Sequence, residues 1–430
     1  MHRNKKTGPY TIAGETLVTR NEVPLRAALI DATIDDIANH GLEAVSLRRI
    51  SAAVGRSTTA IFQHFGGKSG LLRASLDHAF ECDRAFHKAM LDEIEGLVPD
   101  HNALVTVIAL YIENLATAAR APIWREILFK AAQLEDAAGL LDRWYAMRED
   151  HWRNVCRVTP GRDHLPPLLV AYTAMEEVYA SVLHADLGYR LALRETIERL
   201  LDAAFDRPAS ISSEVAIWQE KRVPAPPAPE RKGDGALAER LIDVAAREIF
   251  QHGVMTLNHR RLTALAGVSP AMIVYHFGDM VTLANAAIWR ALMQGLPAFL
   301  DDEIPETSSR GTMAAWATTL GETVSHGASG PSAGFYIAYA RIVGQVCLLA
   351  RRNESLVPLV RHLRSIEGSG VYRASKFSWP TMLEMSRANA AGFAIWIKGF
   401  AILNGGLARD KVDPRILIDA ISALVARPNS

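Results

Sequence analysis

The chain has 430 residues, a length that fits two or three domains. Hydrophobic residues make up 49% of it and charged residues 22%, a balance that supports substantial cores in a soluble protein. The formal net charge is zero, which excludes an overall basic bias, so any binding to nucleic acid would have to come from local patches.

Residues 1–23 form a polar arm that carries Arg3, Lys5, Lys6 and Arg20. We expect a flexible tail here, and the alternative is an arm that follows a DNA backbone or minor groove. The start of the chain lacks the apolar segment of a signal peptide, and the most apolar late stretch is interrupted by Lys398. Three cysteines without metal-ligand spacing predict no metal site and no cofactor. We therefore expect a cytoplasmic protein.

The stretch from Leu25 to His40 has one apolar face and predicts an amphipathic helix that ends at Gly41. Two short helices with a tight turn follow. Ser46 suits the cap of the first helix, Gly55 the turn, and Ser57 the cap of the second. This pattern predicts a helix-turn-helix, whose second helix is the kind that enters a DNA major groove.

Further residues carry a family resemblance: His64-Phe65, Lys68 and Leu71-Leu72. With Ile50-Ser51 and the turn Val54-Gly55-Arg56-Ser57, they make the stretch similar to the DNA-binding domain of the TetR/AcrR family of bacterial regulators. The resemblance implies a helix-turn-helix domain over residues 24–80. It also implies that the helix from Lys68 connects a DNA-reading head to a regulatory body.

The same pattern occurs a second time. Asn258–Met280 aligns with Ser46–Lys68 without a gap, and His276 lies 212 residues (276 − 64) after His64. Ala266-Gly267-Val268-Ser269 fits the family's turn, and Pro270 stands at the favoured first helical position. The chain therefore resembles a tandem TetR-like protein, with a second helix-turn-helix domain over residues 236–290.

No stretch alternates as a strand does, so the predicted fold is all-α. In a first body over 81–206 we expect helices near 101–119, 122–133, 135–157, 165–186 and 190–205. In a second body over 291–430 we expect them near 311–327, 332–351, 353–366, 381–406 and 414–426. A Pro/Ala-rich linker over 207–235 separates the halves. Its apolar knot (Val215, Ile217, Trp218) either docks on a body or is a simple linker cluster.

In the TetR family the last two body helices pair with those of a partner subunit. The resemblance therefore implies an intrachain pseudo-dimer. Further homodimerisation stays open.

Small side chains at the start of the second helix of each head would reach base edges, and flanking groups would bind phosphates. The expected DNA contacts are Ser46, Arg48, Arg56, Ser57, Thr58, Thr59, Gln63, His64 and Lys68 in the first head, and Asn258, Arg260, Arg261, Ser269, Pro270, Tyr275 and His276 in the second. The second head has Val274 and Met280 where the family has Tyr and Lys, and Asp279 adds a negative charge. We expect it to bind more weakly or to read a different half-site, so that the operator is an imperfect palindrome.

The resemblance also implies a small-molecule pocket in the bodies. The candidates are aromatic: Trp124, Phe129, Trp144, Tyr145, Trp152 and Tyr179 in the first body, and Trp316, Phe335, Tyr336, Tyr339, Trp379 and Trp396 in the second. Aromatic residues at helical spacing more often form a core, but their number favours a small apolar or aromatic effector.

The sequence thus predicts a DNA-binding transcriptional regulator, by family default a ligand-responsive repressor released by its effector. One alternative is an enzyme, but we find no phosphate-binding glycine loop, His-Glu-x-x-His helix or Gly-x-Ser-x-Gly elbow and therefore expect none. The other alternative is a TetR-like sensor or interaction protein with weakened or lost DNA binding.

Overall fold

The computed structural model describes residues 25–118, 121–130, 137–157, 163–205, 207, 213–227, 235–254, 257–293, 311–325, 333–406, 417–418 and 420. Regular structure in these ranges is entirely helical, with no strand, which confirms the predicted all-α class there. The N-terminal arm and most of the helix expected near 414–426 lie outside the described residues.

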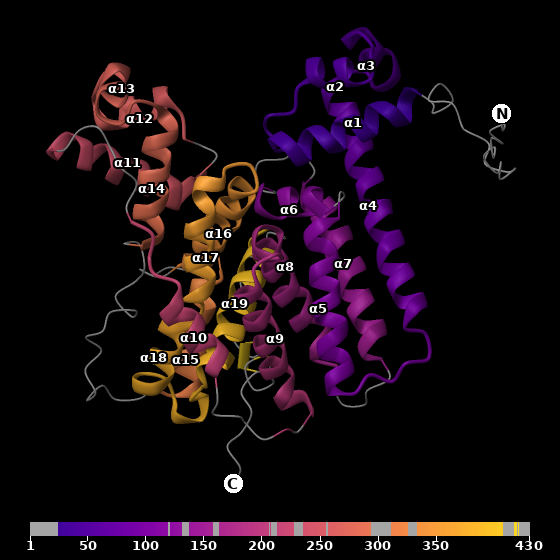
Figure 1. Ribbon diagram of the computed structural model, residues 1–430, viewed down its shortest axis with the longest axis vertical. Coiled ribbons are helices and arrows are strands. Elements are labelled where there is room, and N and C mark those ends of the chain that lie inside the picture. The colour runs from indigo at the N-terminus through magenta and orange to yellow at the C-terminus, as the bar shows by residue number, and fades with distance from the viewer. Residues whose placement is uncertain are drawn as a thin grey trace, which may run out of the picture.

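The first half begins with a small helical head followed by a bundle of longer helices (Figure 1). The helices are α1 (Leu25–His40), α2 (Leu47–Ala53), α3 (Thr58–Phe65), α4 (Lys68–Glu93), α5 (His101–Thr117), α6 (Ala121–Lys130), α7 (Ala137–Cys156), α8 (Leu165–Leu183) and α9 (Leu187–Asp202). Local chemistry sets several of their ends. The Asp100 carboxylate accepts the Ala103 amide at the start of α5, and Pro166 lies in the first turn of α8.

The second half also begins with a small helical head, and helices of mixed length follow it (Figure 1). After α10 (Glu214–Arg222) come α11 (Ala236–His252), α12 (His259–Ala266), α13 (Pro270–Phe277), α14 (Met280–Met293), α15 (Met313–Thr323), α16 (Phe335–Ala350), α17 (Val357–Ser365), α18 (Ser369–Phe377) and α19 (Arg387–Gly406). Short 3-10 turns span Ala203–Phe205, Glu354–Leu356 and Thr381–Leu383.

Two helices were not expected from the sequence. The segment predicted as a linker contains α10, which docks on α9 because the Glu195 carboxylate accepts the Val215 and Ala216 amides at 3.2 and 2.8 Å. The apolar knot is therefore part of a docked helix, but its Ile217 and Trp218 side chains are exposed. The other unexpected helix is α18, which begins after Gly368, a residue in the left-handed conformation at φ 74°.

The helix predicted over 381–406 is shorter than expected. Pro380 lies at the preceding break, Thr381–Leu383 is only a 3-10 turn, and α19 begins at Arg387. The Ser386 hydroxyl accepts the Asn389 amide at 3.2 Å and caps the start of α19.

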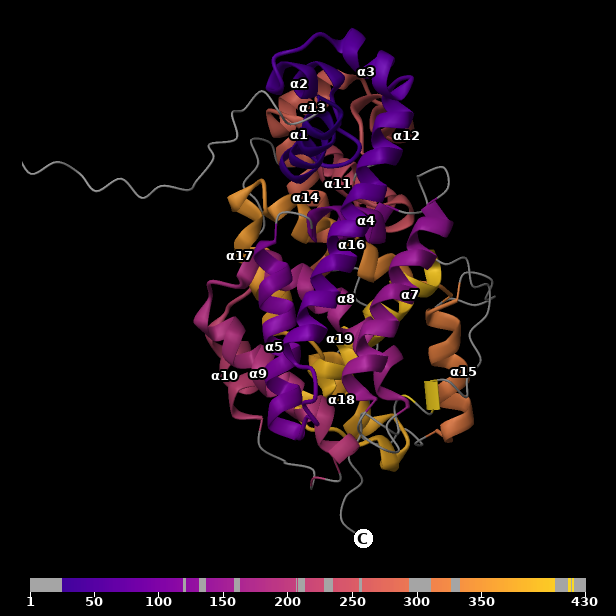
Figure 2. The ribbon, with the colours of Figure 1, turned by 90° about the vertical axis from the view of Figure 1, so that its right-hand side faces the viewer.

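The two heads lie at the same end of the molecule, and Figures 1 and 2 both place α3 and α13 there. Below them the two bodies meet where α8 packs against α19. A Cβ on Gly399 would lie 1.8 Å from the Ala171 carbonyl oxygen, so the absence of a side chain lets the two backbones approach closely. A buried ion pair from Arg364 to Glu176, at 2.9 Å, also joins the halves.

Within the described ranges, no single helix is both long enough and apolar enough to cross a bilayer. Two sharply bent helix pairs reach that length and composition only when their members are counted together.

Candidate nucleic-acid interface

The first head is built on local capping chemistry. The Ser46 hydroxyl accepts the Arg49 amide at the start of α2, as predicted. Gly55 makes the turn at φ 65°, and the Arg56 amide then bonds to the Ser51 carbonyl at 2.9 Å. Gly66 ends α3 at φ 73°. The cap and the two glycines set the ends of α2 and α3, and each helix buries one isoleucine, Ile50 and Ile61.

An ion pair fixes α2 to α1. The Arg49 guanidinium lies 2.6 Å from the buried Asp36 carboxylate, which also accepts the Ser46 amide at 3.0 Å. Burial alone would raise the pKa of Asp36, but the hydrogen bonds from Arg49 and Ser46 outweigh it and hold that pKa below its usual value. Arg49 therefore positions the helix pair.

Helix α3 carries four of the nine residues predicted to touch DNA in the first head. Thr59, Gln63 and His64 are exposed there, and Thr58 is half-buried. Arg48 and Arg56 are exposed beside them and form no ion pair with any residue that the structure describes. Ser57 is exposed at the start of α3, whereas the Lys68 ammonium donates to the Val45 carbonyl at 2.8 Å and so also ties α4 to the head.

The second head has the same cap and turn. Its helices α12 and α13 begin 212 residues (259 − 47 and 270 − 58) after α2 and α3. The Asn258 side chain accepts the Arg261 amide at 2.9 Å, and Gly267 makes the turn at φ 64°. The Arg261–Glu248 ion pair, at 2.5 Å, occupies the place of Arg49–Asp36 at the same offset. The two heads thus share caps, turn and ion pair.

Two predicted contacts of the second head have other surroundings. His276 is buried, with 7% of its surface exposed, whereas its predicted DNA contact would need an exposed side chain. Arg261 is held by Glu248 and positions α12, as Arg49 positions α2. Asn258, Arg260, Ser269, Pro270 and Tyr275 are exposed as a DNA contact requires. Asp279 accepts the Thr282 amide at 2.8 Å and caps α14.

Helix α16 contacts the base of the second head, and Arg352, just beyond the end of α16, contacts the base of the first. Arg341 donates to the Phe250 and Gln251 carbonyls at the end of α11. Arg352 donates to the Ile37 and Ala38 carbonyls near the end of α1. Phe250 lies 212 residues (250 − 38) after Ala38, so the two arginines cap equivalent ends of the two head helices.

A second pair of contacts links each head to the helix beneath it. The Leu42 amide donates to Glu126 on α6 at 3.2 Å, and the Val254 amide donates to Gln345 on α16 at 2.7 Å. Glu126 also accepts from Arg352 at 2.7 Å, while Gln345 donates to the Phe129 carbonyl of α6 at 3.1 Å. The supports of the two heads are therefore bonded to each other through α6 and α16.

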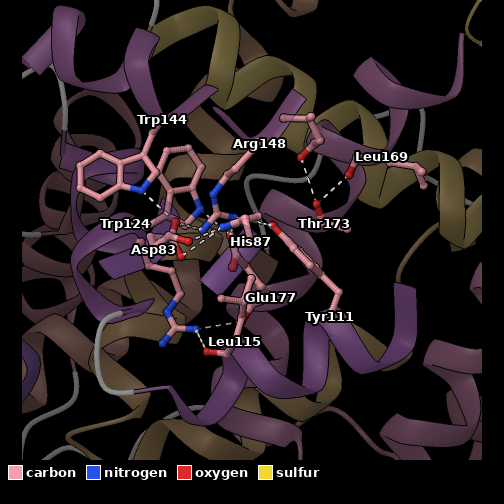
Figure 3. A network of polar contacts seen from close by, with 12 residues as sticks. Asp83, His87, Tyr111, Leu115, Trp124, Trp144, Arg148, Leu169, Thr173 and Glu177 are labelled. Atoms are coloured by element: carbon pink, nitrogen blue, oxygen red, sulfur yellow. Dashed lines mark hydrogen bonds and ion pairs between the residues drawn. The ribbon is translucent and has the colours of Figure 1, made fainter. Parts of the chain in front are cut away.

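The interior of the first body is closed by a buried polar network (Figure 3). Arg148 on α7 donates to Glu177 at 2.9 Å and to Asp83 at 3.1 Å, and its guanidinium also bonds to the Tyr111 hydroxyl. Trp124 donates to Glu177 at 2.5 Å and Trp144 to Asp83 at 2.9 Å. The network joins helices α4 to α8.

The aromatic residues predicted to line a first pocket are thus distributed around this interior. Trp124 and Trp144 belong to the network, and Trp152 packs on Tyr111 with ring centroids 4.8 Å apart. Phe129 touches Gly344 of α16, and Tyr179 donates to Glu367 of the second body at 2.5 Å. Tyr145 is only partly buried.

The second body contains a cavity of about 70 Å³ beside α16. Three of the predicted aromatic residues line it: Phe335, Tyr336 and Tyr339. Glu367 and Lys398, a buried ion pair, form its polar wall. The other predicted residues are placed elsewhere: Trp316 and Trp379 pack on each other with ring centroids 5.3 Å apart, and Trp396 packs on Phe393 and Phe400.

A wider groove of about 540 Å³ runs between the Pro-rich segment and α17. Its lining includes Asp186, Gln219, Arg222 and Arg361. The described residues contain no cluster of His, Cys, Asp or Glu that could hold a metal ion.

The comparison with known families agrees with the geometry of the first head. Residues 29–75, from within α1 to within α4, match the model of bacterial regulatory proteins of the tetR family. No curated protein matches the chain. The matched domain supports a DNA-binding transcriptional regulator of this family.

Proposed function

We propose that the chain is a non-enzymatic transcriptional repressor that binds one operator through two unlike helix-turn-helix heads. The observation that carries this proposal is the recurrence of cap, turn and ion pair at an offset of 212 residues. A recurrence of this kind supports a fused tandem unit, and the contacts of α8 with α19 support a pseudo-dimer within one chain.

A salt-dependent mobility shift with the DNA upstream of the chain's own gene tests DNA binding. Because each phosphate contact releases counterions, the Arg48→Ala, Arg56→Ala double variant should lower the slope of log affinity against log salt by about 2. Lys88→Ala is the matched control, since Lys88 is exposed near the far end of α4, and should leave the slope unchanged. Absence of any specific shift, together with stabilisation by a small molecule, would favour the sensor alternative.

The two heads should contribute unequally. Arg260 is the counterpart of Arg48, but the second head has Met280 at the place of Lys68. Arg260→Ala should therefore weaken operator binding less than Arg48→Ala, and a footprint should be asymmetric about its centre. A symmetric footprint, or a larger loss with Arg260→Ala, would contradict this ranking.

We propose further that a small apolar effector enters the cavity beside α16 and releases the operator. The cavity is lined by Phe335, Tyr336 and Tyr339 of α16, and the same helix holds the second head through Gln345 and Arg341. A ligand that displaces α16 would therefore also move the support of the first head through Arg352. The two heads would no longer match the half-site spacing.

Ser369→Trp tests this route because the larger side chain would fill the cavity from its half-buried edge. Small aromatic compounds that raise the melting temperature of the unmodified chain should release its operator, and the variant should lose both effects. Met382→Trp is the control, since Met382 is exposed outside the cavity. A variant that still responds would place the effector elsewhere, for instance in the groove beside α17.

A further inference from the structure

The outward face of α13 offers fewer hydrogen-bonding groups than that of α3. Pro270, Ala271, Val274 and Tyr275 recur at helical spacing on one exposed face, with Val274 56% and Tyr275 71% exposed. The equivalent positions of α3 carry Thr58, Thr59, Phe62 and Gln63. The two threonine hydroxyls of α3 are thus replaced in α13 by groups that form no hydrogen bond, and the Gln63 amide is replaced by the Tyr275 hydroxyl. The exposed ring of Phe62 is replaced by the smaller Val274.

This difference limits what α13 can read. In the major groove, each base is distinguished by its hydrogen-bonding groups, except that thymine also presents a C5-methyl group. A side chain such as Val274 has no donor or acceptor, so its favourable contact in the groove is with that methyl group. Gln63 on α3 can instead bond in two places to adenine.

The surroundings of α13 favour DNA over a protein partner for this face. Residues 259–277 contain no Asp or Glu, and Arg260 and His259 are exposed on α12 beside the face. The face also lies at the same end of the molecule as α3 (Figures 1 and 2). We propose that α13 reads thymine methyl groups through Val274 and Tyr275, so that its half-site is selected by thymine content and the half-site of α3 by adenine contacts.

The inference rests on the proposed DNA binding, and the experiment separates the two. Duplexes selected by the full chain from a random pool supply the probe. Each thymine of the selected duplex is then replaced in turn by deoxyuridine, which removes the methyl group and leaves the base-pairing edge unchanged. At the thymines that α13 touches, each replacement should weaken binding about fourfold, since burial of one methyl group contributes about 0.8 kcal/mol.

Variants assign the effect to side chains. Val274→Ala should weaken binding to the thymine duplex and remove the deoxyuridine effect at one or two positions, because the group that meets the methyl is gone. Gln63→Ala is the matched control on α3: it should leave those positions unchanged and make an adenine position insensitive to replacement by 7-deazaadenine. Both residues are exposed, so neither change should disturb folding.

Three results would overturn the inference. If the chain binds its selected duplex and no deoxyuridine replacement changes the affinity, α13 reads no methyl group although DNA binding stands. If Val274→Ala instead abolishes self-association of the free chain, the face belongs to a second copy of the chain. If no duplex is selected at all, the proposed function fails and the inference fails with it.

Discussion

The two bodies place their buried charges differently. In the first body, the buried Arg148 bonds to carboxylates on α4 and α8 and so joins three helices. In the second body, the Glu367–Lys398 pair lies at the wall of a cavity beside α16. The comparison suggests that one body serves as a rigid anchor for its connecting helix, while the other keeps space in which a ligand can act.

Removal of Arg148 should have the largest effect on the first body. Arg148→Met should destabilise the chain by about 3–5 kcal/mol, because Asp83 and Glu177 would remain buried and would lose the cation that lies between them. The free energy of unfolding in urea measures the loss. Arg153→Met is the control on the same helix, and its exposed ion pairs should contribute less than about 1 kcal/mol. Equal losses would mean that the buried network does not anchor the body.

The anchor should also be sensitive to acid. Burial first, and then the nearby His87 and Arg148, lower the pKa of His151 to about 3. Below pH 6.5 the His151 imidazole is therefore protonated in the unfolded chain but neutral in the folded chain. The free energy of unfolding should decrease as the pH falls from 6.5 toward 3. Between pH 7 and pH 5 the loss should be roughly 2 kcal/mol.

The variant His151→Phe keeps a ring that can stack on Tyr111 and should remove that part of the pH dependence. Urea unfolding at the two pH values gives the comparison. The same slope in the variant and in the unmodified chain would show that other groups cause the acid sensitivity.

A smaller effect is expected where the two bodies meet. Gly399→Ala would place a Cβ 1.8 Å from the Ala171 carbonyl oxygen, so α8 and α19 would have to separate at a cost of about 1–3 kcal/mol. Gly392→Ala on the same helix is the control, because its Cβ would meet Thr196 at 3.4 Å and should be nearly neutral. Unfolding midpoints decide between them. An equal effect of both changes would point to helix propensity instead of close approach.

Much of each head could be predicted from the sequence because its structure depends on short-range chemistry. The caps at Ser46 and Asn258 form within three residues of their partners. The ion pairs of Arg49 and Arg261 were missed, although each arginine has a carboxylate 13 residues before it and this spacing recurs in both heads. A comparison of the two copies for recurring charge pairs could have found them.

Other features depend on contacts between residues that are far apart in the sequence, which local spacing does not predict. The motif has a histidine in both heads, yet His64 is exposed and His276 is buried, because exposure depends on what packs around the end of the helix. The partners of Arg148 come from helices up to 65 residues away. Aromatic residues of the bodies read alike in sequence, and tertiary packing decides that Tyr336 lines a cavity while Trp152 fills a core.

Helix α16 and Arg352, which lies just beyond its end, give both heads a shared support. Coupling free energies are reciprocal, so if displacement of this helix loosens the operator, occupation of the operator must lower the affinity of the effector by the same factor. A chain already bound to its operator would then respond only at a higher effector concentration than a free chain. The effector concentration needed for induction in a cell would depend on how many operators are occupied.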